Sequence, residues 1–184
     1  MTDLNIDEYA LTEPGPTMVR TAQVSGCGAY RYSLTRAWAA GSWVTWVMLN
    51  PSTADGTVDD PTIRRCIAFS KAWGFGGLTV VNLFALRSTD PKALLTHADP
   101  CGPHNLQYVK GAVGGSTLAV AAWGAHKLPQ ERVRIEEVAE WFNVPLVCLG
   151  TTKNGSPRHP LYVRADQERL PWPSHSKESH APGN

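Results

Sequence analysis

Four short, strongly apolar runs divide the middle of the chain, and they constrain its fold more than any other feature. They span residues 43–49, 78–84, 117–123 and 146–149. Runs that are apolar almost without interruption are typical of strands covered on both faces of a sheet. Helical patterns lie between them. This order predicts an α/β protein, a three-layer α/β/α sandwich around a mainly parallel, four-stranded central sheet.

The segments around these runs carry helix and turn signals. Asp60 is a predicted helix N-cap with Pro61 at the first helical position, and this helix is expected to end at Gly74. Asp90-Pro91 is expected to open a short helix in the same way. Further patterns predict helices over 104–113 and 130–142, and an N-terminal β-hairpin formed by 21–24 and 30–35.

Length and charge limit the organisation of the chain. Its 184 residues suit a single domain, which we place at 18–172 because the polar ends, 1–17 and 173–184, are expected to be flexible. The net charge of +1 excludes a bulk polycation, so affinity for nucleic acid would need a local basic patch. The absence of a long apolar run and of a basic leader predicts a cytoplasmic protein without a membrane partner.

The cysteines and a group of aspartates bear on metal binding. The four cysteines are widely spaced, without a C-x-x-C, which favours reduced structural thiols over an iron–sulfur cluster. Asp55, Asp59 and Asp60 are open to three interpretations: caps, an acidic wall that selects a substrate, or a divalent-metal cluster. We predict no metal ion and no cofactor.

Polar side chains follow each of the four apolar runs. The carboxyl ends of parallel strands meet at one edge of a sheet, where ligands bind. A single Asn-Pro or His-Pro is explained by a turn, but four polar strand ends at one edge predict a site. The ends are Asn50-Pro51-Ser52, Asn82-Leu83-Phe84, Trp123-Gly124-Ala125-His126, and Lys153 to Arg158-His159-Pro160.

Four of these segments, in this order, resemble the uracil-DNA glycosylase superfamily. The first resembles the asparagine form of its first motif, and the others resemble a strand ending in Asn, an L-W-G strand and the final H-P-S-P-L motif. The resemblance covers about residues 43 to 165 and implies the fold and activity of a DNA glycosylase. The segments M-L-N-P-S-T-A-D and D-D-P-T-I-R-R-C are also similar to signatures of a bacterial and phage family without an assigned activity. The four matching segments are 46–52, 80–83, 121–126 and 159–162.

The resemblance implies catalytic and base-binding roles for particular residues. Breaking the C1′–N bond of a nucleoside gives an oxocarbenium-like sugar and negative charge on the departing base. Asn50 would hold the attacking water and His159 would donate to the base. Each of the three polar residues also has a purely structural interpretation. Asn50 would cap a turn, Asn82 would bond to loop backbone, and His159 would lie in a surface turn. The implied base-binding residues are Pro51, Ser52, Asn82, Phe84 and Trp123, with Asn82 reading the base edge.

The resemblance also makes DNA the expected partner, with no obligate protein partner. A base reaches such a pocket only by leaving the duplex. An apolar wedge after the final His-Pro would hold the gap open, and here it would be Leu161 and Tyr162. The candidate phosphate contacts are Arg64, Arg65, Lys153, Arg158 and Arg164.

Departures from the superfamily pattern bear on the substrate. The final Ser-Pro is absent, Leu49 replaces a small or polar residue, and Ser52 stands where uracil-specific relatives carry a tyrosine that blocks the pyrimidine C5 position. These departures argue against plain uracil and predict a pyrimidine enlarged at C5, such as a hypermodified base of phage DNA. Two other functions stay open: a non-catalytic module that binds modified bases, and a hydrolase or transferase of free nucleosides or nucleotides.

Overall fold

The structure is a computed structural model that describes residues 17–125, 128, 131–139 and 144–172. The ends predicted to be flexible therefore lie outside the described residues, apart from Thr17. His126 and both ends of the helix predicted over 130–142 also lie outside them. No helix in the described part of the chain is long and apolar enough to cross a membrane.

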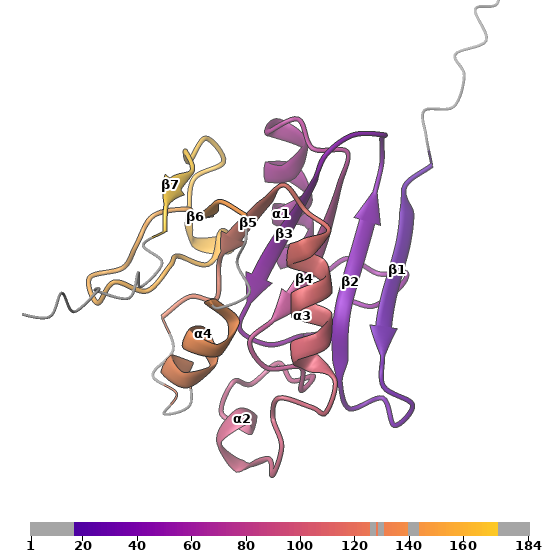
Figure 1. Ribbon diagram of the computed structural model, residues 1–184, viewed down its shortest axis with the longest axis vertical. Coiled ribbons are helices and arrows are strands. Elements are labelled where there is room, and N and C mark those ends of the chain that lie inside the picture. The colour runs from indigo at the N-terminus through magenta and orange to yellow at the C-terminus, as the bar shows by residue number, and fades with distance from the viewer. Residues whose placement is uncertain (1–16, 126–127, 129–130, 140–143, 173–184) are drawn as a thin grey trace, which may run out of the picture.

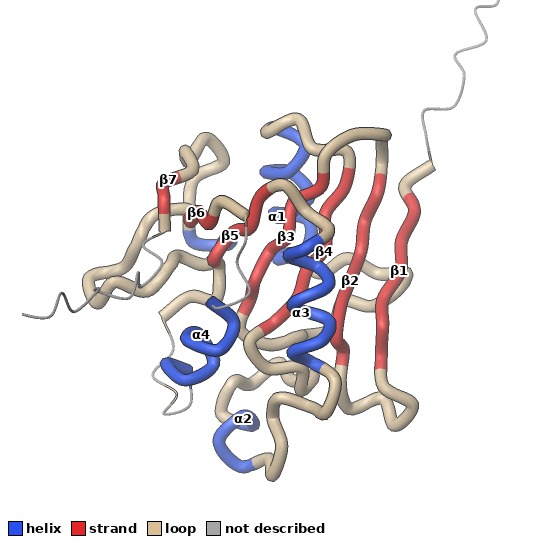
Figure 2. The backbone as a smooth tube through the Cα atoms, viewed as in Figure 1, coloured by secondary structure: helices blue, strands red, loops and turns tan. Residues whose placement is uncertain are grey.

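One mixed sheet of seven strands runs through the molecule in the order β1-β2-β4-β3-β5-β6-β7 (Figures 1 and 2). The four predicted central strands form its parallel core, β4-β3-β5-β6. The strands are β1 (Val19–Val24), β2 (Arg31–Ala37), β3 (Trp43–Met48), β4 (Gly77–Asn82), β5 (Leu118–Ala121), β6 (Leu146–Cys148) and β7 (Leu170–Pro171).

The prediction of a four-stranded sheet was wrong at both edges. The hairpin β1–β2 is part of the same sheet, because β2 pairs antiparallel with β4, with Leu34 opposite Val80. At the other edge β7 pairs antiparallel with β6. Both additions cover a strand edge that would otherwise leave backbone N–H and C=O groups unpaired. The first addition also carries the start of β2, at Arg31, to the carboxyl end of β4.

Helices cover both faces of the sheet. They are α1 (Pro61–Ala72), α2 (Ala93–Thr96), α3 (Asn105–Gly114) and α4 (Glu131–Ala139), with a 3₁₀ turn η1 (Pro160–Tyr162). On one face α1 packs on alternate strand residues such as Trp46 and Val80. On the other, α3 and α4 pack on the intervening residues, such as Val47 and Val81. The predicted three layers are present, with α3 in front of the sheet in Figure 1.

Local signals account for where α1 begins and ends. The Asp60 carboxylate accepts a hydrogen bond from the N–H of Ile63 at 2.8 Å, and Pro61 follows it, as predicted. The helix ends before Gly74, whose φ of 81° is a left-handed conformation that favours glycine. The Asp90-Pro91 segment instead forms a turn, and α2 begins at Ala93.

The loop between β3 and α1 is held by two of the three aspartates. Backbone hydrogen bonds from Thr57 and Val58 lower the pKa of Asp55 to about 2. Asp59 accepts from the fully buried guanidinium of Arg36 at 2.7 Å. Asp55 and Asp59 therefore shape the loop, and Asp60 caps α1. No three His, Cys, Asp or Glu side chains gather into a possible metal site within the described residues.

Candidate functional site

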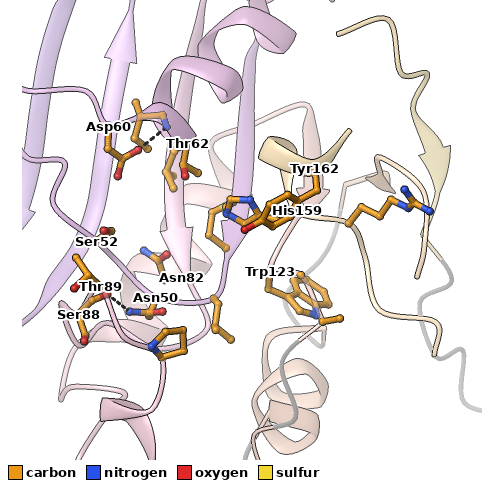
Figure 3. Close-up of a pocket in the computed structure, with 18 of the residues that line it drawn as sticks. Asn50, Ser52, Asp60, Thr62, Asn82, Ser88, Thr89, Trp123, His159 and Tyr162 are labelled. Atoms are coloured by element: carbon orange, nitrogen blue, oxygen red, sulfur yellow. Dashed lines mark hydrogen bonds between the residues drawn. The ribbon is translucent and has the colours of Figure 1, made fainter. Parts of the chain in front are cut away.

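A pocket of about 590 Å³ opens at the carboxyl edge of the parallel strands (Figure 3). The ends of β3, β4 and β5 form its floor, the start of α1 forms one wall, and the loop that carries His159 forms another. Its volume lies within the range of small-molecule sites, about 300–1,000 Å³. The site residues predicted from the sequence that line it are Asn50, Ser52, Asn82, Trp123, Arg158, His159 and Tyr162.

Asn82 places an unpartnered amide in this pocket. Its side chain is only 1% exposed, and neither Nδ2 nor Oδ1 makes a hydrogen bond within the described part of the chain. A buried polar group without a partner costs about 1–3 kcal/mol. The loop contact considered from sequence is not made. The amide therefore offers one donor and one acceptor, side by side, at the pocket.

Asn50 is oriented by the loop that follows β4. Its Nδ2 donates to the carbonyl of Ser88 at 2.8 Å, and the Ser88 N–H donates in turn to the carbonyl of Pro51 at 2.9 Å. With the amide nitrogen held in this way, Oδ1 is the atom left without a hydrogen bond among the described residues. Asn50 thus offers an acceptor to the pocket at a set orientation.

His159 is held by the backbone that follows it. Its Nδ1 accepts a hydrogen bond from the N–H of Leu161 at 3.3 Å, as the cap of η1. An Nδ1 that accepts cannot carry the proton of the neutral ring, so that proton lies on Nε2. The ring centre lies 5.6 Å from that of Tyr162. His159 therefore lines the pocket as a donor at Nε2.

Of the other predicted base-binding residues, two line the pocket and two do not. Ser52 and Trp123 line the pocket, and the buried Trp123 packs edge-on against Trp172 at 5.6 Å. Pro51 and Phe84 are buried and do not line it. Phe84 is fully buried among the core residues on the α3 side of the sheet, so its role is core packing.

Comparison with known protein families assigns this chain to one of them. A family model described as "Protein of unknown function (DUF1643)" matches residues 31–161 of the 184. The chain belongs to the DUF1643 family. No curated protein and no solved structure matches it. The residues matched by the DUF1643 model run from Arg31 in β2 to Leu161 in η1, and so include every predicted pocket residue except Tyr162.

Several of the basic residues of this DUF1643 chain that were predicted to contact DNA phosphates already bond to protein groups. Arg65 donates to the carbonyls of Pro160 and Val163, and so anchors the loop that carries His159. Arg64 donates to the carbonyl of Asp59. Arg164 is exposed but pairs with Asp166 at 3.0 Å.

Four further residues predicted to contact DNA come from the segment that includes His159, and two of them, Arg158 and Tyr162, line the pocket. Lys153 is exposed, and Arg158 lines the pocket while its Nε donates to the carbonyl of Thr151 at 3.1 Å. Beside them η1 presents two apolar side chains, with Tyr162 79% exposed and Leu161 40% exposed. Of the two predicted wedge residues, Tyr162 therefore lines the pocket, and Leu161 is its exposed neighbour in η1.

Several lining residues were not predicted from the sequence. Arg31 comes from the hairpin, and Thr62 from the first turn of α1. Ser88 and Thr89 follow β4, and Thr152 precedes Arg158. The sequence had indicated Asp60 as a helix cap. The position of Ser88, in the loop after the second apolar run, could have indicated that residue. Arg31 had no signal, because the sequence does not show that its strand joins the central sheet.

The cysteines take no part in the pocket. All four are free thiols, and none lines it. Burial raises the pKa of Cys66, Cys101 and Cys148, which keeps these thiols protonated at neutral pH.

Proposed function

We propose that this DUF1643 protein is a DNA glycosylase-like hydrolase that flips and excises a modified pyrimidine from DNA. The observation that carries the proposal is Asn82, whose buried amide lacks partners at the floor of the pocket. The Watson–Crick edge of a pyrimidine offers adjacent acceptor and donor atoms, which match the two ends of an amide. A base would therefore satisfy both atoms at once.

Asn50 and His159 supply the chemistry in this proposal. Oδ1 of Asn50 accepts a hydrogen bond from a water molecule and directs the water oxygen at C1′ of the sugar. The C1′–N bond breaks as the water oxygen bonds to C1′, and the bonding electrons leave with the base. The proton that the added water loses passes through solvent to the departed base, so the products are a C1′ hydroxyl and the neutral base. Negative charge grows on the base oxygen, where the Nε2–H of His159 donates. No metal ion or cofactor enters these steps.

The direct test is base release from oligonucleotides. The wild type is expected to leave abasic, alkali-labile sites at C5-substituted pyrimidines and to release the base. Asn82→Ala is expected to slow release about 30–150-fold, because two hydrogen bonds of about 1–1.5 kcal/mol each are lost. Its thermal midpoint should not fall comparably, since the Asn82 side chain makes no hydrogen bond within the described residues.

Two results would contradict the proposal. Tight binding of modified DNA without base release would favour the binding module. Release from free nucleosides but not from oligonucleotides would favour a nucleoside or nucleotide enzyme. The latter has some structural support, because Arg64, Arg65 and Arg164 already bond to the protein. The assay therefore includes each modified base both as a nucleoside and within an oligonucleotide.

Ser52 tests the expected substrate class. Ser52 lines the pocket, and a tyrosine there would fill the space that a C5 substituent needs. Ser52→Tyr is expected to abolish release of C5-substituted pyrimidines with little change in thermal midpoint. The matched control is Thr53→Tyr, at an exposed neighbour that does not line the pocket. A wild-type preference for plain uracil over 5-substituted pyrimidines would contradict this interpretation.

A further inference from the structure

The pocket contains a buried arginine that the proposed chemistry does not use. Arg31 is 3% exposed and lines the pocket at the start of β2. Its Nη1 donates to the carbonyl of Ala54 at 2.6 Å, and its backbone N–H donates to Ala85 at 3.0 Å. The first bond anchors the guanidinium, and the second fixes the backbone from which the side chain extends.

The other edge of this guanidinium lacks a protein partner. Nε is buried without a hydrogen bond, and Nη2 makes none within the described part of the chain. Nε and Nη2 are the two parallel donors with which arginine grips a carboxylate or a phosphate. Arg31 lines the pocket, so this unused bidentate edge is the part of its side chain left for a ligand there.

The charges around Arg31 leave it short of negative partners. Burial lowers its pKa to about 10, which still leaves the group charged at neutral pH. Asp60 acts in the opposite direction, but its carboxylate already caps α1 and forms no ion pair with Arg31 among the described residues. Arg36 and Arg87 add further positive charge. A buried cation in this setting is stabilised by an anion.

The start of α1 adds to the same preference. Thr62, the second residue of this 12-residue helix, lines the pocket. Its N–H lies in the first turn, where helix amides lack partners and the helix dipole favours negative charge. Thr62 and Arg31 thus place donors from two separate elements around one space.

We propose that Arg31 is a specificity-determining residue that binds an oxyanion carried by the ligand of this pocket. The inference rests on the proposed function in that the same pocket holds the base, with Asn82 at the base edge. The oxyanion has two possible sources, an acidic substituent at C5 of the pyrimidine or the phosphate of a nucleotide. Both present two oxygens to the Nε–Nη2 edge.

Matched ligand pairs test this with the wild-type protein alone. Calorimetric titration compares 5-carboxy-2′-deoxyuridine with 5-hydroxymethyl-2′-deoxyuridine, and deoxyuridine 5′-monophosphate with deoxyuridine. The anionic member of one pair is expected to bind about tenfold to a hundredfold more tightly, as for charge-assisted hydrogen bonds. A preference in the first pair assigns the oxyanion to C5, and one in the second assigns it to the phosphate. Equal affinity within both pairs would overturn the inference.

Variants assign the preference to Arg31. Arg31→Gln is expected to reduce it to less than about threefold, and Arg31→Lys to an intermediate value, because lysine keeps the charge but not the fork. The control, Lys71→Gln, removes an exposed positive charge in the last turn of α1 and should keep the full preference. If Arg31→Gln does not fold, the oxyanion preference of Arg31→Lys decides whether Arg31 is responsible. An undiminished preference in a folded Arg31 variant would overturn the assignment.

The readout separates this inference from the proposed function. Oxyanion-selective binding without base release would leave the role of Arg31 intact and contradict the hydrolase. Base release from neutral substrates, with no oxyanion preference, would support the hydrolase and contradict the role of Arg31.

Discussion

His159→Ala is expected to slow base release by about 10²–10³-fold, in line with the loss of one oxyanion donor, about 2.7–4 kcal/mol. The donor is the Nε2–H of a ring whose Nδ1 accepts from the N–H of Leu161. Negative charge develops on the base only as the C1′–N bond breaks, so the effect should fall on the chemical step rather than on binding. Single-turnover rates and DNA affinity, measured on the same oligonucleotide, distinguish the two.

Two controls separate catalysis from folding at this position. His97 is an exposed histidine whose Nδ1 likewise accepts from a backbone N–H two residues later, at Asp99, but it does not line the pocket. His97→Ala should leave base release unchanged. His159→Asn can still cap η1 but lacks the imidazole donor, so it should be nearly as slow as the alanine variant. A wild-type rate in either His159 variant would remove this residue from the mechanism.

Asp59→Ala is expected to destabilise the fold by about 3–5 kcal/mol, because it leaves a buried charge without its partner. The Arg36 side chain is 0% exposed, and its Nε lies 2.7 Å from the Asp59 carboxylate. Its other donors bond to carbonyls of Thr21, Thr35 and Asp55, which carry no compensating charge. Urea unfolding measures the change as a shift of the midpoint at constant slope.

The matched control is Asp166→Ala, which removes a carboxylate from an exposed pair with Arg164 and should leave the midpoint almost unchanged. Replacing both buried partners, as Arg36→Met with Asp59→Leu, should be less destabilising than Asp59→Ala because no unpaired charge remains. A midpoint for Asp59→Ala close to that of the wild type would show that the carbonyl contacts alone hold Arg36.

Much of the fold and of the candidate site could be predicted because the signals are local or follow from strand direction. A strand buried on both faces needs apolar residues at successive positions, and this is visible in 43–49 and 78–84. Parallel strands end at one edge, so Asn50 and Asn82 come together without knowledge of the loops. The cap of α1 depends only on Asp60 and its own first turn.

Other features were decided by contacts between distant parts of the chain. The pairing of β2 with β4 uses backbone hydrogen bonds, which side-chain patterns do not specify, and it brings the strand that begins at Arg31 to the pocket. Whether an arginine is free for phosphate also depends on distant groups: Arg65 bonds to carbonyls 95 and 98 positions away. Phe84 is buried in a core cluster with Val109 and Val113, which are distant from it in the sequence.

The sequence by itself determined the α/β class, the central strands, the cap of α1 and the polar strand ends, because each depends on a few neighbouring residues or on strand direction. Only the tertiary structure decided the edges of the sheet, the orphaned amide of Asn82 and the open edge of Arg31. The physical reason is that burial and hydrogen-bond satisfaction are properties of the packed molecule: a polar atom is unpartnered only when all of its surroundings are in place.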